Sequence, residues 1–422
     1  MTASETKTPK RRFAGFTDDW EQWKLGKVGS TFTGLSGKTK EDFGHGDAKF
    51  VTYVNVFGNV ISNPEMLESV EIDSKQNSVQ YGDVFFTTSS ETPEEVGISS
   101  VWLENQENVY LNSFCFGYRP TEKFDVYYLA SVLRSDSVRK KIVFLAQGIS
   151  RYNISKTKVM EMTIPVPDLA EQERVGQFFT TLDATITLHQ RKLEKVKALK
   201  VAYLAEMFPA EGECKPKRRF AGFTDAWEQC RFYDNIEDII DFRGRTPKKL
   251  GMDWSESGYL ALSALNVKQG YIDFNADVHY GNQELYDKWM AGKKLTEGKV
   301  LFTTEAPMGN VAQVPDNKGY ILSQRTISFD IKPEKITDDF LAILLTSPLV
   351  FNELTALSSG GTAKGISQKS MSHLSVKTPK DLKEQEKVAS FFQILDRTIT
   401  FHQRKLEKLQ NLKKAYLDEM FA

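Results

Sequence analysis

Two segments of this chain occur twice, and this duplication constrains the fold more than any other feature of the sequence. Residues 10–25 (KRRFAGFTDDWEQWKL) match residues 217–232 at twelve of sixteen positions. Residues 169–208 match residues 382–421 at 27 of 40 positions. The long regions between the matched segments differ widely. A chain that repeats its frame and varies what the frame holds is expected to present two related surfaces with different binding preferences.

The composition is that of a folded protein with more than one domain. At 422 residues, with 40% hydrophobic and 26% charged residues, the chain is too long for one ordinary core, and two to four domains are expected. No apolar run is long enough to span a bilayer, and the N-terminus lacks the apolar core of a signal peptide, so we expect a cytoplasmic location. The scattered Cys115, Cys214 and Cys230 form no CxxC or Cys/His cluster, which indicates neither a disulfide framework nor a zinc site.

Positive charge is concentrated locally, although the net charge is only −1. The neutral balance argues against a chain that binds nucleic acid over its whole surface. The stretch 136–164 nevertheless carries six Lys and Arg, and the run RGRTPKK at 243–249 carries four with no acid. Each run is either a solvated surface or a binding patch.

The two variable regions, 26–160 and 233–373, are predicted to be mixed α/β domains that share a fold. Runs rich in Val, Phe, Tyr, Ile and Thr predict strands. The predicted strands are Lys49–Val56, Asp83–Thr88, Lys299–Thr304 and Gly319–Ile331, and the predicted helices are Phe124–Leu133 and Asp338–Leu345. The run GDVFFTT at 82–88 resembles GKVLFTT at 298–304, which indicates a common skeleton.

The second repeated segment is predicted to be a long helix with a coiled-coil seam. Apolar and a few polar residues follow a strict 4-3 spacing in both copies, which is typical of a coiled coil. The seam residues are Leu182, Ile186, His189 and Leu193, continued by Val196, Lys200, Tyr203 and Met207, and their counterparts are Leu395, Ile399, His402 and Leu406, continued by Leu409, Lys413, Tyr416 and Met420. Each seam must pack against a partner helix, and the simplest partner is the other copy of the segment. An antiparallel pair would create a pseudo-twofold axis within one chain.

The sequence contains none of the motifs that would point to an enzyme. There is no GxGxxG, GxxxxGK[ST], HExxH or GxSxG, and Asn63-Pro64 is followed by Glu65 rather than by the Pro-aromatic pair of an amino-methyltransferase. His189 and His402 recur, but both lie on the heptad helices, where a role in register is expected. We therefore interpret the chain as a recognition and assembly protein, with no catalytic residues and no metal ligands of its own.

The repeated lead-in, the LxEQExV…FFxxLDxxIxxHQRKLEK helices and the GD-[VI]-[LF]-F-T strand resemble the specificity subunit of type I restriction–modification systems. The resemblance covers nearly the whole chain, and the helical repeats are its most specific part. It implies an α+β architecture with two α/β target-recognition domains held apart by two long antiparallel coiled-coil helices. The expected segments are a lead-in (1–25), target-recognition domain 1 (26–165), helix 1 (166–208), a linker with the second lead-in (209–232), target-recognition domain 2 (233–378) and helix 2 (379–422).

The resemblance also implies function and partners. Each domain would read one half of a bipartite, asymmetric target in double-stranded DNA, and the helices would set the length of the unread spacer. Two methyltransferase (modification) subunits and the restriction/translocase subunits would be the protein partners. S-adenosylmethionine, ATP and Mg would be bound by those partners, and no cofactor by this chain.

Candidate DNA contacts lie in loops next to the predicted strands and in the basic runs. Lys and Arg would supply phosphate contacts, whereas polar side chains in the groove would supply sequence choice. The candidates are Lys38, Lys40, Thr87, Thr88, Ser89, Ser90, Ser150, Arg151, Tyr152, Asn153 and Lys156 in the first domain, and Arg243, Arg245, Lys248, Lys249, Thr303, Thr304, Thr362, Lys364, Gln368 and Lys369 in the second. The loop at 89–97 adds three glutamates, Glu91, Glu94 and Glu95, which would repel phosphate. It is expected to face a base edge, a partner subunit or water.

A protein of a different class stays open at this point. The alternative is a coiled-coil scaffold or adaptor whose two lobes bind proteins rather than DNA, and the neutral net charge slightly favours it. DNA binding that weakens with salt would separate the two interpretations.

Overall fold

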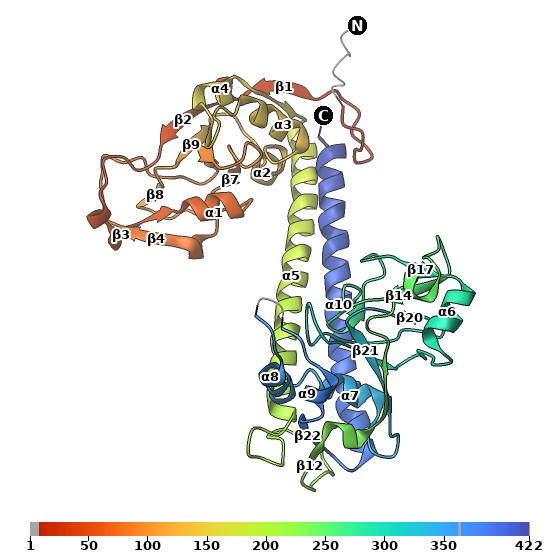
Figure 1. Cartoon of the computed structure of the whole chain (residues 1–422). Coiled ribbons are helices and arrows are strands. Elements are labelled where there is room, and N and C mark those ends of the chain that lie inside the picture. Colours follow the sequence, from red (N-terminus) through yellow and green to blue (C-terminus); the bar gives the residue numbers. More distant parts are fainter. Residues whose placement is uncertain (1–7, 362–363, 422) are drawn as a thin grey trace. The chain divides into compact units, whose positions relative to one another are not determined.

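Each of the two long helices is shared between two structural units. The computed structural model describes residues 8–361 and 364–421. Unit 1 contains the chain up to Gln190 together with the chain from Arg404 onward, and unit 2 contains Arg191–Gln403. Helix α5 (Leu169–Met207) and helix α10 (Leu382–Glu419) therefore each contribute one half to either unit (Figure 1).

Unit 1 is built on an antiparallel sheet of four strands in the order β2-β9-β5-β7. A second sheet has the order β4-β3-β8, in which β3 and β8 run parallel. The strands are β1 (Glu21–Lys24), β2 (Gly29–Thr33), β3 (Phe43–Val51), β4 (Leu67–Val70), β5 (Val84–Thr87), β6 (Ser89–Ser90), β7 (Ser99–Val101), β8 (Val109–Leu111), β9 (Cys115–Pro120), β10 (Tyr152–Asn153) and β11 (Thr163–Val166), and the α-helices are α1 (Tyr53–Gly58), α2 (Val126–Val132), α3 (Asp136–Leu145) and α4 (Lys156–Glu161).

Unit 2 repeats this topology. Its four-stranded sheet has the order β13-β21-β18-β19, and its second sheet has the order β17-β14-β20 with β14 and β20 parallel. The strands are β12 (Glu228–Arg231), β13 (Ile236–Asp241), β14 (Tyr259–Leu262), β15 (Val267–Lys268), β16 (Tyr271–Ile272), β17 (Tyr280–Gly281), β18 (Val300–Thr303), β19 (Val311–Gln313), β20 (Ile321–Leu322), β21 (Thr326–Ile331) and β22 (Ser375–Thr378), and the α-helices are α6 (Gln283–Met290), α7 (Asp338–Leu344), α8 (Pro348–Leu357) and α9 (Gln368–Met371). Short 3₁₀ helices cover Leu25–Lys27, Lys40–Asp42, Pro64–Met66, Phe232–Asn235 and Lys248–Leu250. The two variable regions thus share one fold, as predicted.

Two of the predicted strands need correction. The run from Lys49 ends as a strand at Val51, because the Thr52 hydroxyl accepts a hydrogen bond from the Asn55 backbone N–H and starts helix α1 there. The run Gly319–Ile331 forms two strands, β20 and β21. Arg325, whose φ of +62° lies in the left-handed region, interrupts it between them.

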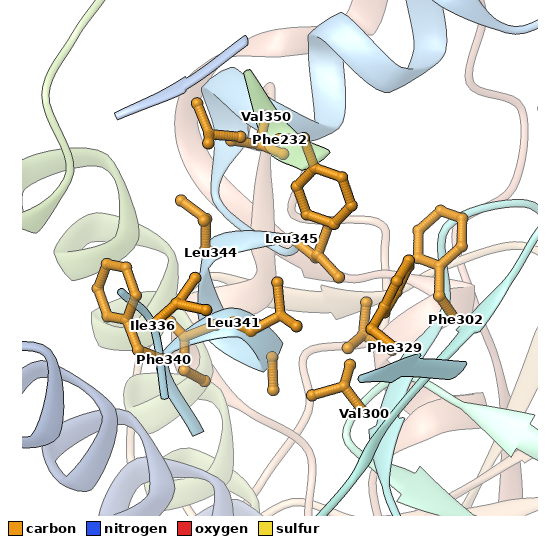
Figure 2. Close-up of a cluster of buried hydrophobic side chains, with 14 of the residues drawn as sticks. Phe232, Val300, Phe302, Phe329, Ile336, Phe340, Leu341, Leu344, Leu345 and Val350 are labelled. Atoms are coloured by element: carbon orange, nitrogen blue, oxygen red, sulfur yellow. The ribbon is translucent and has the colours of Figure 1, made fainter. Parts of the chain in front are cut away.

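The core of unit 2 forms where helix α7 packs against the four-stranded sheet. Val300 and Phe302 on β18 and Phe329 on β21 face Leu341 of α7 and Leu345, the residue that directly follows α7 (Figure 2). All five are fully buried. Their alternation along the strands matches the period of two that brings one strand face to the core. Unit 1 has its own core around Val84, Phe86 and the counterpart helix α2.

A buried carboxylate ties each repeated lead-in to the start of a long helix. Glu171, near the start of α5, accepts two hydrogen bonds of 2.7 Å from the Arg12 guanidinium and one of 2.9 Å from the Trp20 indole. In unit 2, Glu384 accepts bonds of 2.6 and 2.7 Å from Arg219 and one of 3.2 Å from Trp227. Each lead-in also contributes one strand to a two-stranded antiparallel sheet, β1 pairing with β11 and β12 with β22. Each lead-in therefore packs against the unit that holds its carboxylate partner.

The halves of α5 and α10 lie antiparallel within each unit. In unit 1, Phe178 of α5 contacts Tyr416 of α10 at 5.0 Å between ring centroids, and Asp183 pairs with Lys413 at 2.6 Å. In unit 2, Tyr203 contacts Phe391 at 4.9 Å, and Lys200 pairs with Asp396 at 2.5 Å.

The predicted seam residues lie on the buried side of these helices. Leu193 is buried, and its companions in the two predicted seams (Leu182, Ile186, His189, Leu395, Ile399, His402 and Leu406) are half-buried. The seam lysines Lys200 and Lys413 are each paired with a carboxylate, Asp396 and Asp183 respectively, so the charges of these two lysines are compensated.

Within the described residues, no single helix is long and apolar enough to cross a membrane. Helices α7 and α8 pass that test only as a pair, by length and composition, and they are bent by 68° at the break between them.

We expect the substitution Glu384→Ala to lower the free energy of unfolding by about 3 kcal/mol, because it leaves Arg219 and the Trp227 indole without their buried partner. Glu171→Ala should act in the same way in unit 1. The matched control is Glu206→Ala, which removes the half-exposed ion pair of the neighbouring Arg218 and should have little effect. Urea denaturation followed by Trp fluorescence measures both; equal losses in Glu384→Ala and the control would contradict the assignment.

Stability should also depend on pH through Asp338, the first residue of α7. Its Oδ1 is buried with no hydrogen-bond partner in the described part of the chain, and burial raises the pKa of Asp338 from 3.8 to about 6. A raised folded-state pKa means that the protonated form stabilises the fold; this contribution is complete below pH 3.8 and is lost as the pH rises through about 6. Asp338→Asn should therefore stabilise the chain at about pH 7.5, by about 1 kcal/mol after allowance for solvent screening.

This gain should disappear near pH 4, where the wild-type carboxyl is already protonated. Thermal unfolding at both pH values measures the difference, with Glu334→Gln, an exposed residue in the turn before α7, as the control. A gain that is equal at both pH values would contradict the role of Asp338 ionisation.

Candidate nucleic-acid interface

Three loops of unit 1 meet at Thr88, directly after strand β5. The Thr88 backbone N–H and hydroxyl both donate to the Phe114 carbonyl, at 3.0 and 2.8 Å. The Thr88 carbonyl accepts from the Ile154 N–H at 3.0 Å. Strand β6 then pairs with β10. The structure therefore brings together the two loops that the sequence singled out, 87–90 and 148–153.

Unit 2 has an equivalent junction at Thr304. Its N–H and hydroxyl donate to the Arg325 carbonyl at 2.8 and 3.2 Å, and its carbonyl accepts from the Ile366 N–H at 2.9 Å. A β-bridge joins Glu305 to Gly365, so the segment around Lys364 lies beside the loop after β18. Thr362 lies outside the described residues.

Several predicted contact residues are used inside the fold instead. Thr87 and Thr303 are fully buried, and their hydroxyls accept from the backbone N–H groups of Ile98 (3.0 Å) and Asn310 (2.9 Å). Both therefore hold the loops rather than presenting a side chain to a ligand. Ser89 and Ser90 are also buried. The Ser90 hydroxyl donates to Glu95 at 2.9 Å, which restrains the acidic loop.

Arg243 belongs to a polar cluster beneath the Thr304 junction. Its guanidinium donates to the Asp241 carboxylate at 2.9 Å and to the Thr304 hydroxyl at 3.3 Å. The Gln368 amide also donates to Asp241, at 2.7 Å. Burial opposes ionisation of Asp241, but the hydrogen bonds from Arg243 and Gln368 outweigh it and lower the pKa of Asp241. The charge of Arg243 is thus already balanced, and a phosphate would have to compete with Asp241 for it.

Three further predicted cations are engaged within the protein. Arg245 donates to the Trp289 carbonyl and lies over the Phe242 ring at 4.2 Å from its centroid. Lys249 donates to the Gly244 carbonyl at 2.7 Å. Lys38 is largely buried between Asp42 and Asp73, at 3.6 and 3.2 Å.

The remaining predicted residues lie at the surface. Exposed side chains are those of Lys40, Ser150, Arg151, Asn153, Lys156, Lys248, Lys364 and Lys369, whereas Tyr152 is half-buried. Six of the eight exposed residues are cations, three of them in each unit. Cations exposed at the surface are what contact with a polyanionic backbone requires.

A hollow of about 210 Å³ opens beside the Thr304 junction, and sequence analysis did not anticipate it. Its lining includes Trp254, His279, Gln324 and Arg325. The Trp254 and His279 rings stack at 5.3 Å, and His279 Nε2 lies 3.2 Å from the Asp277 carboxylate. These residues come from loops far apart in the sequence, so no spacing pattern could have indicated them. Across the described residues, no group of three or more His, Cys, Asp or Glu side chains could hold a metal ion.

Comparison with known proteins gives consistent matches. The family described as "Type I restriction modification DNA specificity domain" matches residues 17–198 and again residues 233–411. The putative type I restriction enzyme MjaX specificity subunit of Methanocaldococcus jannaschii is 20% identical over 420 residues, which cover 97% of this chain and 94% of that protein. The EcoKI specificity subunit of Escherichia coli K12 is 23% identical over 194 residues, covering 45% of this chain and 40% of that protein.

Solved structures show the same fold at low sequence identity. The type I restriction–modification S subunit from M. genitalium superposes with a TM-score of 0.62 at 12% identity, covering 98% of this chain and 99% of that one. A second match is a chain from a structure of the assembly and conformational transition of the type I restriction–modification system. It superposes with a TM-score of 0.51 at 17% identity, covering 94% of this chain and 96% of that one.

Proposed function

Because the chain belongs to the type I restriction–modification DNA specificity family, we propose that each of its two units reads one half of a bipartite, asymmetric DNA target. The chain is the DNA sequence-recognition subunit of a type I restriction–modification complex. The observation that carries the two-reader proposal is the pair of junctions at Thr88 and Thr304. The backbone hydrogen bonds are the same in both, while the loops around them differ in sequence. Two junctions with the same hydrogen bonds but different loop sequences are suited to binding two different half-sites.

The exposed cations of each unit would supply phosphate contacts, which fix position on the duplex without reading sequence. In unit 2 these are Lys248, Lys364 and Lys369. In unit 1 they are Lys40, Arg151 and Lys156.

The paired helices would set the spacing between the half-sites. One face of a duplex presents its base edges once per turn, about every 34 Å, and a helix gains about 1.5 Å per residue. The ion pairs Lys200–Asp396 and Lys413–Asp183 support this role, because each fixes the axial register of α5 against α10 within its unit. The coiled-coil packing and the pseudo-twofold relation of the two readers are part of the proposal.

The repeated surfaces would bind two methyltransferase subunits, one at each. In unit 1, Phe13 of the lead-in and Arg174, Phe178 and Leu182 of α5 contribute to an open groove of about 400 Å³. The same positions in unit 2 carry Phe, Lys, Phe and Leu, so one partner surface could fit both. Restriction/translocase subunits would join the assembly through these partners. The chain itself would be non-catalytic and act in the cytoplasm, with S-adenosylmethionine, ATP and Mg held by the partner subunits.

The test is selection from a library of randomised duplexes by the full chain together with its methyltransferase partner. We expect two fixed clusters of base pairs separated by an unread spacer, with an affinity that falls steeply as salt rises. Binding without sequence choice, or no binding to DNA, would favour the protein scaffold instead. Methyl transfer by the purified chain alone would contradict the non-catalytic role.

Removing Lys248, Lys364 and Lys369 together by substitution to Ala should weaken binding to all duplexes alike. It should reduce the slope of log affinity against log salt by about 3, roughly one for each phosphate that is no longer neutralised, and leave the selected sequence unchanged. The matched control is Lys288→Ala on α6, a lysine already paired with Glu284 at 2.8 Å, which should leave the slope as it is. Filter binding at several salt concentrations measures the slopes; a changed sequence preference in the triple variant would contradict a phosphate role.

Duplicating one heptad in each helix, residues 184–190 and residues 397–403, should lengthen the unread spacer by about three base pairs, since seven residues add about 10 Å. The 4-3 spacing of the seams is preserved, so the helices can still pair. The selected half-sites should stay the same. A heptad added to α5 alone is the control and should impair pairing of the helices. An unchanged spacer in the double insertion, with both half-sites still selected, would show that the helices do not set the distance.

A further inference from the structure

One position is held by the same hydrogen bonds in both units but carries different side chains. The Phe114 carbonyl accepts two hydrogen bonds from Thr88, and the Arg325 carbonyl accepts the same two from Thr304. Each residue directly precedes a central strand of the four-stranded sheet, β9 in unit 1 and β21 in unit 2. Phe114 and Arg325 are therefore structural counterparts, placed where the three variable loops of each unit meet.

Both side chains project to the surface. Phe114 is 59% exposed, which is unusual for a ring at a rigid turn. The turn itself is fixed, because Asn112 Oδ1 accepts from the Phe114 N–H at 2.9 Å while the Asn112 amide donates to the Val51 carbonyl at 3.0 Å. The fold thus fixes the backbone of Phe114 and leaves more than half of its side chain in solvent.

The Arg325 side chain, like that of Phe114, has few restraints from the rest of the fold. The side chain is 53% exposed and forms an ion pair with Glu305 at 3.7 Å. An exposed pair at that distance contributes little and is easily exchanged for a better acceptor. Arg243 in the same unit differs, because Asp241 already neutralises it. Of these two arginines, Arg325 is the one whose guanidinium is available to donate hydrogen bonds to a ligand.

The surroundings of Arg325 suit a flat, polar ligand edge. Arg325 and Gln324 line the hollow beside the junction together with Trp254 and His279. The hollow thus combines hydrogen-bonding groups from Gln324 and Arg325 with the stacked Trp254 and His279 rings. A guanidinium in such a place can form the paired hydrogen bonds that guanine accepts at O6 and N7 in the major groove.

We propose that Phe114 and Arg325 are the equivalent specificity-determining residues of the two units, Arg325 reading a guanine and Phe114 contacting a thymine methyl group. This inference rests on the proposed reading of one half-site by each unit. An apolar ring cannot bond a base edge but can discriminate through the thymine methyl. The chemical difference at one shared position would then account for part of the asymmetry of the target.

The inference is tested by library selection with single variants of the full chain and its methyltransferase partner. Arg325→Ala should lose the preference for guanine at one base pair of one half-site. Its affinity for the best wild-type duplex should fall about tenfold or more, and duplexes mismatched at that pair should be bound as before. Arg325→Lys should also lose much of the preference, because lysine keeps the charge but not the paired geometry. Phe114→Ala should lose one thymine preference in the other half-site.

The exchange variant Phe114→Arg gives the strongest test, since it should introduce a guanine preference into the first unit's half-site. Glu305→Gln is the matched control: it removes the ion pair but keeps Arg325, and its selected sequence should equal that of the wild type. In each variant, the other base pairs of the altered unit's own half-site report that this unit has folded.

The selected sequences distinguish failure of the proposed function from failure of this inference. A wild-type chain that selects no split target would overturn the proposed function itself. A wild-type chain that selects a split target, with Arg325→Ala and Phe114→Ala selecting the same bases, would overturn the inference alone. A change in both half-sites from one substitution would also contradict it, because each residue is assigned to one unit.

Discussion

The packing of each unit depends on the hydrogen bonds that one buried carboxylate accepts, Glu171 in unit 1 and Glu384 in unit 2. Each one joins a lead-in, through an arginine and a tryptophan indole, to the first turn of a long helix. The lead-in also forms a two-stranded antiparallel sheet with the strand that precedes that helix. A buried carboxylate is costly unless its oxygens are fully bonded, and here both oxygens are used. The position of the long helix relative to its domain is therefore fixed at the point where the helix begins.

Most of the frame could be predicted from the sequence, because the frame is what the chain repeats. The seam residues follow a spacing that is typical of a helix, and they are indeed partly or fully buried. The common fold of the two variable regions was indicated by the similar sequences of residues 82–88 and 298–304, which end at Thr88 and Thr304. Strand ends were less predictable: the run from Lys49 changes from strand to helix at a Thr52 cap, and Arg325 breaks a run that reads as continuous.

The candidate site was predictable only at the level of loops. The loops after β5 and before α4 were expected to be functional, and the structure places them side by side. Which side chains face outward depends on hydrogen bonds that join distant parts of the chain. Thr87 and Thr303 turn inward to bond neighbouring backbone, Arg243 and Lys38 are matched with carboxylates, and Phe114 and Arg325 are left outward. None of these outcomes has a local sequence signal.

The two units are not built from the chain in the same way. Unit 2 is one continuous segment, Arg191–Gln403, whereas unit 1 needs the chain from Arg404 onward as well. Phe421 is buried against Trp20, Tyr128 and Phe179, and the Arg11 side chain donates to Glu419 at 2.6 Å. During synthesis domains generally fold in order from the N-terminus. The core of unit 1 includes Met420 and Phe421, so it can be completed only after the whole of unit 2, Arg191–Gln403, has been synthesised.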